Sequence, residues 1–184
     1  MANQKFFWLA LGGLGIWYVI NNQTDVETAA QAAASDLEAA TMGWKNAGSG
    51  PTWIPILNEA ERQYGIASDV LAAVAYQESS FIENFIRGLK KSSDGLSLGI
   101  MQLQTQYFPN LVGPSVPIPY TDQNVSDQIN AAAQVFATNY ASLQSWPETI
   151  AAYNQGLSGV ERNGITSTDY VANVLANAPS AAYS

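Results

Sequence analysis

Apolar residues recur with the period of an α-helix along most of the chain after residue 51. The longest such pattern covers residues 124–143, where one face would carry Ile129, Ala132, Ala133, Phe136, Tyr140 and Leu143. We predict further helices at residues 52–64, 69–80, 147–154 and from residue 168 onward. Residues 109–119 hold four prolines and are predicted to be a loop. No strand pattern of comparable length occurs, so the pattern predicts a mainly α domain over residues 52–184.

Capping residues support two of these helices. Thr52 can cap the helix at 52–64, and Gly65 stands where a helix commonly ends in the left-handed conformation. Ser68 can cap the helix at 69–80.

The start of the chain has a different pattern. Residues 6–20 are uncharged and largely apolar, and a helix over them would be about 22 Å long, short of the ~30 Å hydrocarbon core of a membrane. We predict an apolar helix in residues 1–22 that anchors the chain in a membrane; a signal peptide and an interfacial or buried helix are alternatives. Lys5 before this segment and acidic residues after it favour a cytoplasmic N-terminus, with the domain on the periplasmic or extracytoplasmic side.

Residues 23–51 are predicted to form an alanine-rich helix and a linker. Thr24 and Glu27 have the spacing of a capping box, and the alanine-rich sequence up to residue 40 favours a helix. Glycine, serine and proline in residues 42–51 are typical of a linker.

The composition excludes several classes of function. A formal net charge of -8 with only seven Lys and Arg residues argues against nucleic-acid binding. The chain has no Cys and no His, which excludes thiolate nucleophiles, Ser–His–Asp catalysis and metals held by Cys or His. In an enzyme of this composition, proton transfer falls to Asp, Glu, Lys or Tyr. We expect no metal and no cofactor.

Glu78 is the first candidate for such proton transfer. It follows Leu71, Val74 and Ala75 at helical spacing, so it would lie on the apolar face of the helix at 69–80. Burial disfavours the charged form of a carboxyl group and raises its pKa, as a general acid at neutral pH requires. The periodicity alone leaves open a half-exposed, inert Glu78.

Four motifs follow one another along the domain. ESSF ends a predicted helix at residues 78–81, GIMQ follows at 99–102, AYNQG at 152–156, and Tyr170-Val171 opens the last helix. In this order and spacing they resemble the catalytic domain of soluble-type lytic transglycosylases, in the lysozyme-like superfamily. The resemblance covers roughly residues 52–178 and implies a lysozyme-like helical fold. Ile100 stands where Leu is more common, which is a conservative difference.

The resemblance also implies a role for each matching residue. Glu78 matches the single catalytic glutamate of the family, and Tyr153 a tyrosine whose hydroxyl group lies near it, where it would orient the glutamate or polarise the substrate's acetamido group. The substrate-binding residues would be Ser79, Ser97, Gly99, Met101, Gln102, Asn154 and Tyr170. Structural roles remain open for several of these, such as core packing for Met101 and a turn for Gly99.

The implied reaction is cleavage of the bond between N-acetylmuramic acid and N-acetylglucosamine in peptidoglycan, leaving 1,6-anhydromuramoyl ends. Glu78 would act alone, first as acid and then as base. A hydrolase on the same fold is one alternative and would need a second carboxylate, for which Glu83 and Asp94 are the candidates. A non-catalytic glycan-binding or assembly protein is another.

The expected partners follow from this reading of the chain. They are peptidoglycan glycan strands, a membrane contacted through residues 6–20, and proteins of a phage virion or a secretion apparatus. In either setting the enzyme would open the wall locally, as a phage enters the cell or as an envelope machine is assembled.

Overall fold

The computed structural model describes residues 5–11, 14–20, 43–93 and 95–183. The chain divides into two compact units, Met1–Gly43 and Trp44–Ser184. Each unit is described by itself.

The N-terminal unit contains two strands where an apolar helix was predicted. β1 (Lys5–Leu11) and β2 (Leu14–Ile20) pair antiparallel, with Trp8 opposite Trp17. The prediction of a helix over residues 6–20 is therefore wrong. Aromatic and β-branched residues favour strands, and the glycines at positions 12, 13 and 15 lower the helix propensity of the segment. Among the described residues no helix is long and apolar enough to cross a membrane, and the predicted alanine-rich helix lies outside them.

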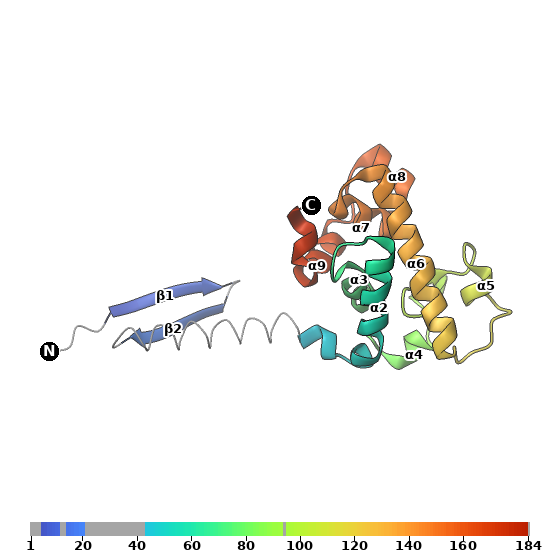
Figure 1. Cartoon of the computed structure of the whole chain (residues 1–184), viewed down its shortest axis with the longest axis horizontal. Helices are drawn as coiled ribbons and strands as arrows, with labels where there is room; N and C mark the ends of the chain where they lie inside the picture. The colour runs from blue at the N-terminus through green and yellow to red at the C-terminus, as the bar shows by residue number, and fades with distance from the viewer. Residues whose placement is uncertain (1–4, 12–13, 21–42, 94, 184) are drawn as a thin grey trace. The chain divides into compact units, whose positions relative to one another are not determined.

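The C-terminal unit is mainly helical, as predicted (Figure 1). Its α-helices are α2 (Gly50–Tyr64), α3 (Val70–Ser79), α4 (Glu83–Ile86), α5 (Pro109–Val112), α6 (Asp122–Leu143), α7 (Trp146–Gln155), α8 (Leu157–Asn163) and α9 (Thr168–Asn177). The remaining elements are the 3-10 helices η1 (Gly43–Asn46) and η2 (Pro179–Tyr183) and the short antiparallel strands β3 (Ser97–Leu98) and β4 (Leu103–Gln104).

Local capping explains where α2 ends and where α6 begins. Gly65 ends α2 in the left-handed conformation at φ 68°, and its N–H donates to the Glu61 carbonyl, as expected of a glycine C-cap. α6 begins at Asp122, two residues before the predicted start, because Thr121 and Asn124 form a reciprocal capping box. α5 lies within the segment that was predicted to be a loop, with Pro109 in its first turn.

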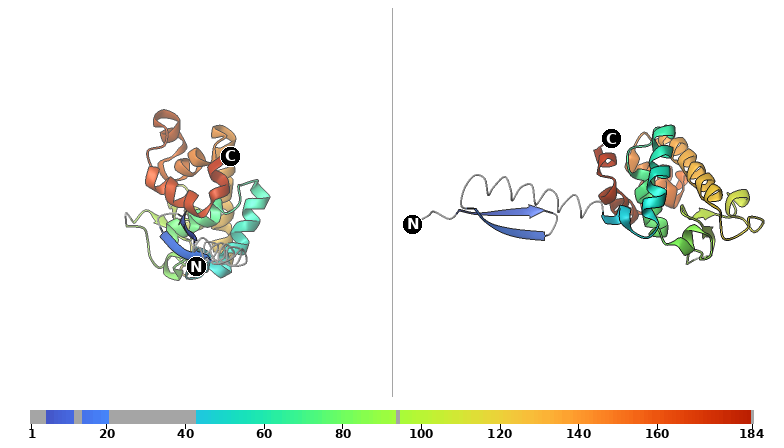
Figure 2. Two further views of the ribbon diagram at one scale, coloured as in Figure 1. Left: turned by 90° about the vertical axis from the view of Figure 1, so that its left-hand side faces the viewer. Right: turned by 60° about the horizontal axis from the view of Figure 1, so that its bottom comes forward.

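Helix α3 lies at the centre of the unit and carries Glu78. Its residues 70–75 are all buried, so it is apolar on every side rather than on one face. α3 packs against α2 and α9, α6 against α2 and α7, and α7 against α8 and α9 (Figure 2). The helix that carries Glu78 is thus held by packing on all sides over residues 70–75.

A buried carboxylate, and not the predicted Ser68, caps the start of α3. Glu61 of α2 accepts hydrogen bonds from the backbone N–H groups of Asp69 at 2.9 Å, Leu71 at 2.8 Å and Ala72 at 3.2 Å. These N–H groups have no partner within their own helix, so Glu61 satisfies three otherwise unpaired donors. Burial raises the pKa of Glu61 to about 7, although the three donors oppose that shift.

Residues 44–51 belong to the helical unit, although their composition predicted a linker. Trp44 is buried and stacks on Phe81, with ring centroids 6.5 Å apart. Lys45 forms an ion pair with Asp69 at 2.5 Å. The compact unit therefore begins before the predicted boundary at residue 52.

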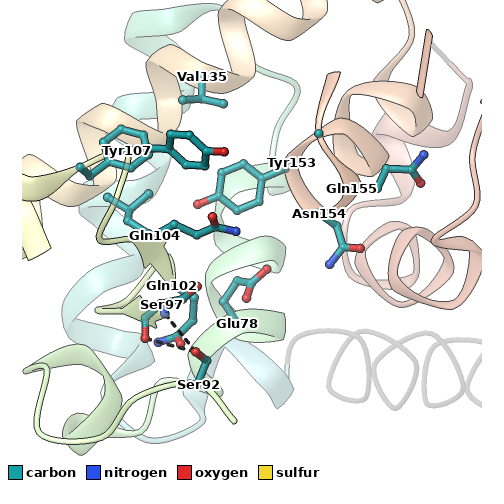
Figure 3. A pocket seen from close by; sticks show the side chains of 13 residues that line it. Glu78, Ser92, Ser97, Gln102, Gln104, Tyr107, Val135, Tyr153, Asn154 and Gln155 are labelled. Carbon is teal, nitrogen blue, oxygen red and sulfur yellow. Dashed lines mark hydrogen bonds between the residues drawn. The ribbon is translucent and has the colours of Figure 1, made fainter. Parts of the chain in front are cut away.

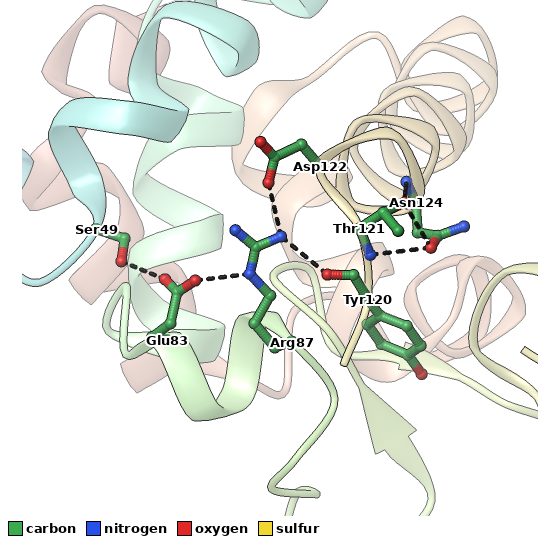
Figure 4. Close-up of polar contacts among 7 residues, drawn as sticks. All are labelled: Ser49, Glu83, Arg87, Tyr120, Thr121, Asp122 and Asn124. Carbon is green, nitrogen blue, oxygen red and sulfur yellow. Dashed lines mark hydrogen bonds and ion pairs between the residues drawn. The ribbon is translucent and has the colours of Figure 1, made fainter. Parts of the chain in front are cut away.

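Arg87 joins α4 to the start of α6 (Figure 4). Its guanidinium donates to Glu83 Oε1 at 2.6 Å, to Asp122 Oδ1 at 2.7 Å and to the Tyr120 carbonyl at 2.9 Å. Glu83 in turn accepts a hydrogen bond from Ser49. The charge of Arg87 is therefore paired within the fold.

Candidate active site

A cavity of about 620 Å³ opens at the end of α3. Side chains from α3, α6, α7, the β3–β4 hairpin and the segment after it converge on it (Figure 3). The lining residues are Glu78, Ser92, Ser97, Gln102, Leu103, Gln104, Tyr107, Phe108, Val135, Tyr153, Asn154, Gln155 and Gly156. The cavity has the size of pockets that enclose most of a drug-sized ligand, which suits a short piece of a polymer.

Glu78 is half-buried in the wall of this cavity, in the last turn of α3. Its Oε1 accepts a hydrogen bond from the Tyr170 hydroxyl at 2.6 Å. Burial raises the pKa of Glu78 to about 7, and the Tyr170 hydrogen bond opposes that shift. Glu78 is therefore poised to give up or take a proton near neutral pH.

Two tyrosines face Glu78 from different helices, Tyr153 from α7 and Tyr170 from α9. Burial and the nearby Glu78 raise the pKa of each well above its ordinary value, so both hydroxyl groups keep their protons at neutral pH. The Tyr170 hydroxyl donates a hydrogen bond to Glu78, whereas the Tyr153 hydroxyl donates a hydrogen bond to the Met101 carbonyl at 2.7 Å. The hydroxyl that bonds to Glu78 is thus that of Tyr170 and not that of Tyr153.

Three of the predicted binding residues line the cavity with polar groups. Ser97 and Gln102 come from the β3–β4 hairpin, and Asn154 follows Tyr153 on α7. The Gln102 amide donates to the Gly99 carbonyl at 2.8 Å, which fixes the side chain across the hairpin. In Figure 3, Ser97, Gln102 and Glu78 lie together at one end of the cavity, and Tyr107 lies at the other.

Three other predicted binding residues have side chains or backbones that serve the fold. Ser79 is buried, and its hydroxyl donates to the Ala75 carbonyl at 2.7 Å. Met101 is fully buried in the core and offers the site only its carbonyl group. Gly99 has φ +82°, and a Cβ there would lie 1.9 Å from Gln128 Oε1. The cavity lining includes none of these three.

The sequence reasoning missed several residues of the cavity wall. Tyr107, 71% exposed, presents a large aromatic ring there, five residues after the GIMQ motif. Gln104 and Phe108 come from the same stretch, and Val135 comes from α6. The signal available in the sequence was an aromatic residue five positions beyond a binding motif, and the helical pattern gave no reason to single it out.

Among the described residues, Glu78 is the one carboxylate that lines the cavity. Glu83 is held by Ser49 and Arg87, whose hydrogen bonds lower its pKa, and it lies outside the cavity lining. Asp94, the other candidate, lies outside the described residues. The described part of the chain also holds no group of three acidic side chains that could bind a metal ion.

Comparison with known proteins agrees with this geometry. A family model described as the Transglycosylase SLT domain matches residues 55–173, which is more than half of the chain. A comparison with curated proteins finds no match. The family consists of lytic transglycosylases that act on the glycosidic bonds of peptidoglycan. The chain therefore belongs to the transglycosylase SLT domain family, within the lysozyme-like superfamily, and is a peptidoglycan-cleaving enzyme.

Proposed function

We propose that the enzyme cleaves the bond between N-acetylmuramic acid and N-acetylglucosamine with Glu78 as its acid and base, and leaves 1,6-anhydromuramoyl ends. The observation that carries this proposal is a half-buried carboxyl group, with its pKa raised to about 7 by burial, and with no second carboxylate among the described lining residues. Glycosidases that use water or an enzymic nucleophile place two carboxylates around the bond. A single carboxylate suits a reaction in which the substrate itself supplies the nucleophile.

In the first step, Glu78 gives its proton to the glycosidic oxygen, and the bond between this oxygen and the anomeric carbon breaks. The acetamido carbonyl oxygen of the muramoyl residue bonds to that carbon and takes up its positive charge, which spreads to the acetamido nitrogen. Tyr153 supports this step because its hydroxyl hydrogen is already engaged in a hydrogen bond to the Met101 carbonyl. Its oxygen can therefore accept the N–H of the charged acetamido group.

In the second step, the 6-hydroxyl oxygen of the same sugar bonds to the anomeric carbon and displaces the acetamido oxygen. The hydroxyl proton passes to the Glu78 carboxylate, which restores the acid. The Tyr170 hydrogen bond stabilises the carboxylate form of Glu78, so it favours the loss of the proton in the first step, while burial of Glu78 favours its return in the second. A carboxyl group with its pKa near the working pH serves both directions of proton transfer.

The polar residues of the cavity suit an uncharged sugar chain. Ser97, Gln102, Gln104 and Asn154 offer hydroxyl and amide groups that pair with sugar hydroxyl and acetamido groups. Tyr107 offers an exposed ring face for stacking. Binding of this kind needs no cluster of basic residues, in keeping with the acidic chain.

The products decide between this reaction and hydrolysis. We expect mass spectrometry of the fragments that the full chain releases from purified peptidoglycan to find anhydromuramoyl ends. Reducing ends, heavier by one water, would contradict the proposal and identify a hydrolase. In that case Asp94→Asn would be the next variant, because Asp94 is the candidate second carboxylate outside the described residues. Asp127→Asn serves as the matched control, since Asp127 lies outside the cavity lining.

The cellular setting is a further part of the proposal and rests on the sequence. The apolar residues 6–20 support attachment to a membrane, with the catalytic unit on its periplasmic or extracytoplasmic side. A phage virion and a secretion apparatus both need such an enzyme to open the wall locally. Flotation of the full chain with lipid vesicles tests the attachment: we expect the chain to float with the vesicles. A chain that stays at the bottom of the gradient would contradict it.

A further inference from the structure

Gln155, the last residue of α7, joins the active-site helix to the segment that leads into α9. Its Oε1 accepts hydrogen bonds from the backbone N–H groups of Thr166 at 2.9 Å and Ser167 at 3.0 Å, and from both of their hydroxyl groups at 3.0 Å. Its Nε2 donates to the Gly164 carbonyl at 2.8 Å. One side chain thus fixes most of the short connection between α8 and α9.

The partners determine how the amide of Gln155 is oriented. Backbone N–H groups can only donate and a carbonyl oxygen can only accept, so Oε1 must face Thr166 and Ser167 while Nε2 faces Gly164. In Figure 3 this amide points away from Glu78. Although Gln155 contributes to the cavity wall, its polar end is used by the chain and not offered to the substrate.

The start of α9 relies on Gln155 in place of an ordinary cap. Ser167 occupies the N-cap position, where a serine hydroxyl usually accepts a hydrogen bond from the helix backbone. Here the side chain makes no capping hydrogen bond, and its hydroxyl donates to Gln155 instead. The first turn of α9 is therefore positioned by a contact from α7.

Tyr170 lies in that first turn, three residues after Ser167. We propose that Gln155 is a positioning residue: it holds the start of α9 so that the Tyr170 hydroxyl donates to Glu78. The titratable groups that face Glu78 are Tyr170 from α9 and Tyr153 from α7, and Tyr170 alone bonds to it among the described residues. The consequence for catalysis rests on the proposed role of Glu78.

The experiment measures the pKa of Glu78 itself. The full chain, with ¹³C-labelled glutamate, is titrated by NMR as wild type, Gln155→Met, Tyr170→Phe and the double variant. Because the Tyr170 hydrogen bond lowers the pKa of Glu78, Tyr170→Phe should raise it above about 7. Gln155→Met should raise it by a similar amount, and the double variant should raise it no further, because both changes remove the same hydrogen bond.

Activity gives the second readout. Cleavage needs protonated Glu78, so its rate falls as pH rises through the pKa of this group, and in Gln155→Met this fall should move to higher pH. We expect the maximal rate to drop by roughly ten- to a hundredfold, the cost of a misplaced catalytic group, with little change in KM. Gln144→Met is the matched control, because Gln144 also bonds carbonyl groups at a helix end but outside the cavity.

Three results would overturn the proposal. The first is an unchanged pKa of Glu78 in Gln155→Met. The second is a lowered pKa of Glu78 in this variant, which would mean that α9 only shields Glu78 from water. The third is a shift in the double variant that equals the sum of the two single shifts. Should Gln155→Met fail to fold, Thr166→Val combined with Ser167→Ala removes two of the five contacts and should give a smaller shift in the same direction. A pKa that shifts as expected without any matching shift in activity would leave Gln155 as a positioning residue and refute the acid role of Glu78.

Discussion

Replacement of Glu78 by Gln is expected to reduce cleavage of peptidoglycan by roughly 10²–10⁴-fold. The amide has the shape of the carboxyl group, and its oxygen can still accept the Tyr170 hydrogen bond. It cannot, however, give a proton to the glycosidic oxygen. The measurement is the rate at which soluble fragments leave purified peptidoglycan. Glu161→Gln is the matched control, because this exposed glutamate of α8 lies outside the cavity.

The stability of the same variant separates lost chemistry from a lost fold. Burial raises the pKa of Glu78 from 4.5 to about 7, so between these pH values the folded chain binds more protons than the unfolded chain. The stability of the wild type relative to Glu78→Gln should therefore fall as pH rises from 4.5 to about 7, and stay level above. Thermal unfolding at both ends of this range measures the change. Full activity in the folded variant would remove Glu78 from the mechanism, and loss of cooperative unfolding would make it a structural residue.

Helical periodicity predicted the elements whose packing is one-sided. On α6, Ile129, Ala132, Ala133 and Phe136 are all buried, as the pattern required. The periodicity could not predict which face of α3 is buried, because residues 70–75 are buried on every side of the helix. The helix was still predicted, because Ser68 can cap its start and Leu71, Val74 and Ala75 recur at helical spacing. Its central position depends on α2 and α9, which are distant in sequence.

Residues 6–20 show where an apolar pattern is ambiguous. A run of apolar residues satisfies a membrane helix and a strand equally well, because neither alternation nor a helical stripe distinguishes them. The pairing of Trp8 with Trp17 depends on contacts between the two halves of the segment. Local propensity alone could not choose between the two structures.

The site residues likewise divide into those that a local motif predicts and those that depend on contacts distant in sequence. The order of the motifs placed Glu78, Tyr153 and Tyr170 at one site. In the structure Glu78 and Tyr153 line the cavity, and the Tyr170 hydroxyl donates to Glu78. The motif order could not tell which side chains of a motif turn inward: Ser79 faces the core because it follows Ala75 by one helical turn. Gln155 was also beyond reach, since its function depends on a contact with residues 164–167 that no local pattern encodes.

Gly99→Ala is expected to destabilise the fold by about 2–5 kcal/mol, which combines the cost of a left-handed backbone with that of overpacking. Gly99 has φ +82°, a conformation that residues with a Cβ rarely adopt. The added Cβ would lie 1.9 Å from Oε1 of Gln128, a fully buried residue of α6. Since Gln128 has no solvent to move into, the β3–β4 hairpin must shift. Chemical denaturation measures the free energy of unfolding of the variant and of the wild type.

A second substitution separates the steric cost from the backbone cost, and both from a role in binding. Gln128→Ala removes the atoms that the new Cβ would meet, so the double variant should lose less stability than the two single variants together. Additive losses would mean that the left-handed backbone alone explains the glycine. A Gly99→Ala variant with unchanged stability and a raised KM would instead support the substrate-binding role that the resemblance implied for Gly99. Gly99 lies against α6 and outside the cavity lining, so we expect the double variant to lose less stability than the two single variants together. The missing side chain of Gly99 then serves the packing that holds Ser97 and Gln102 at the site.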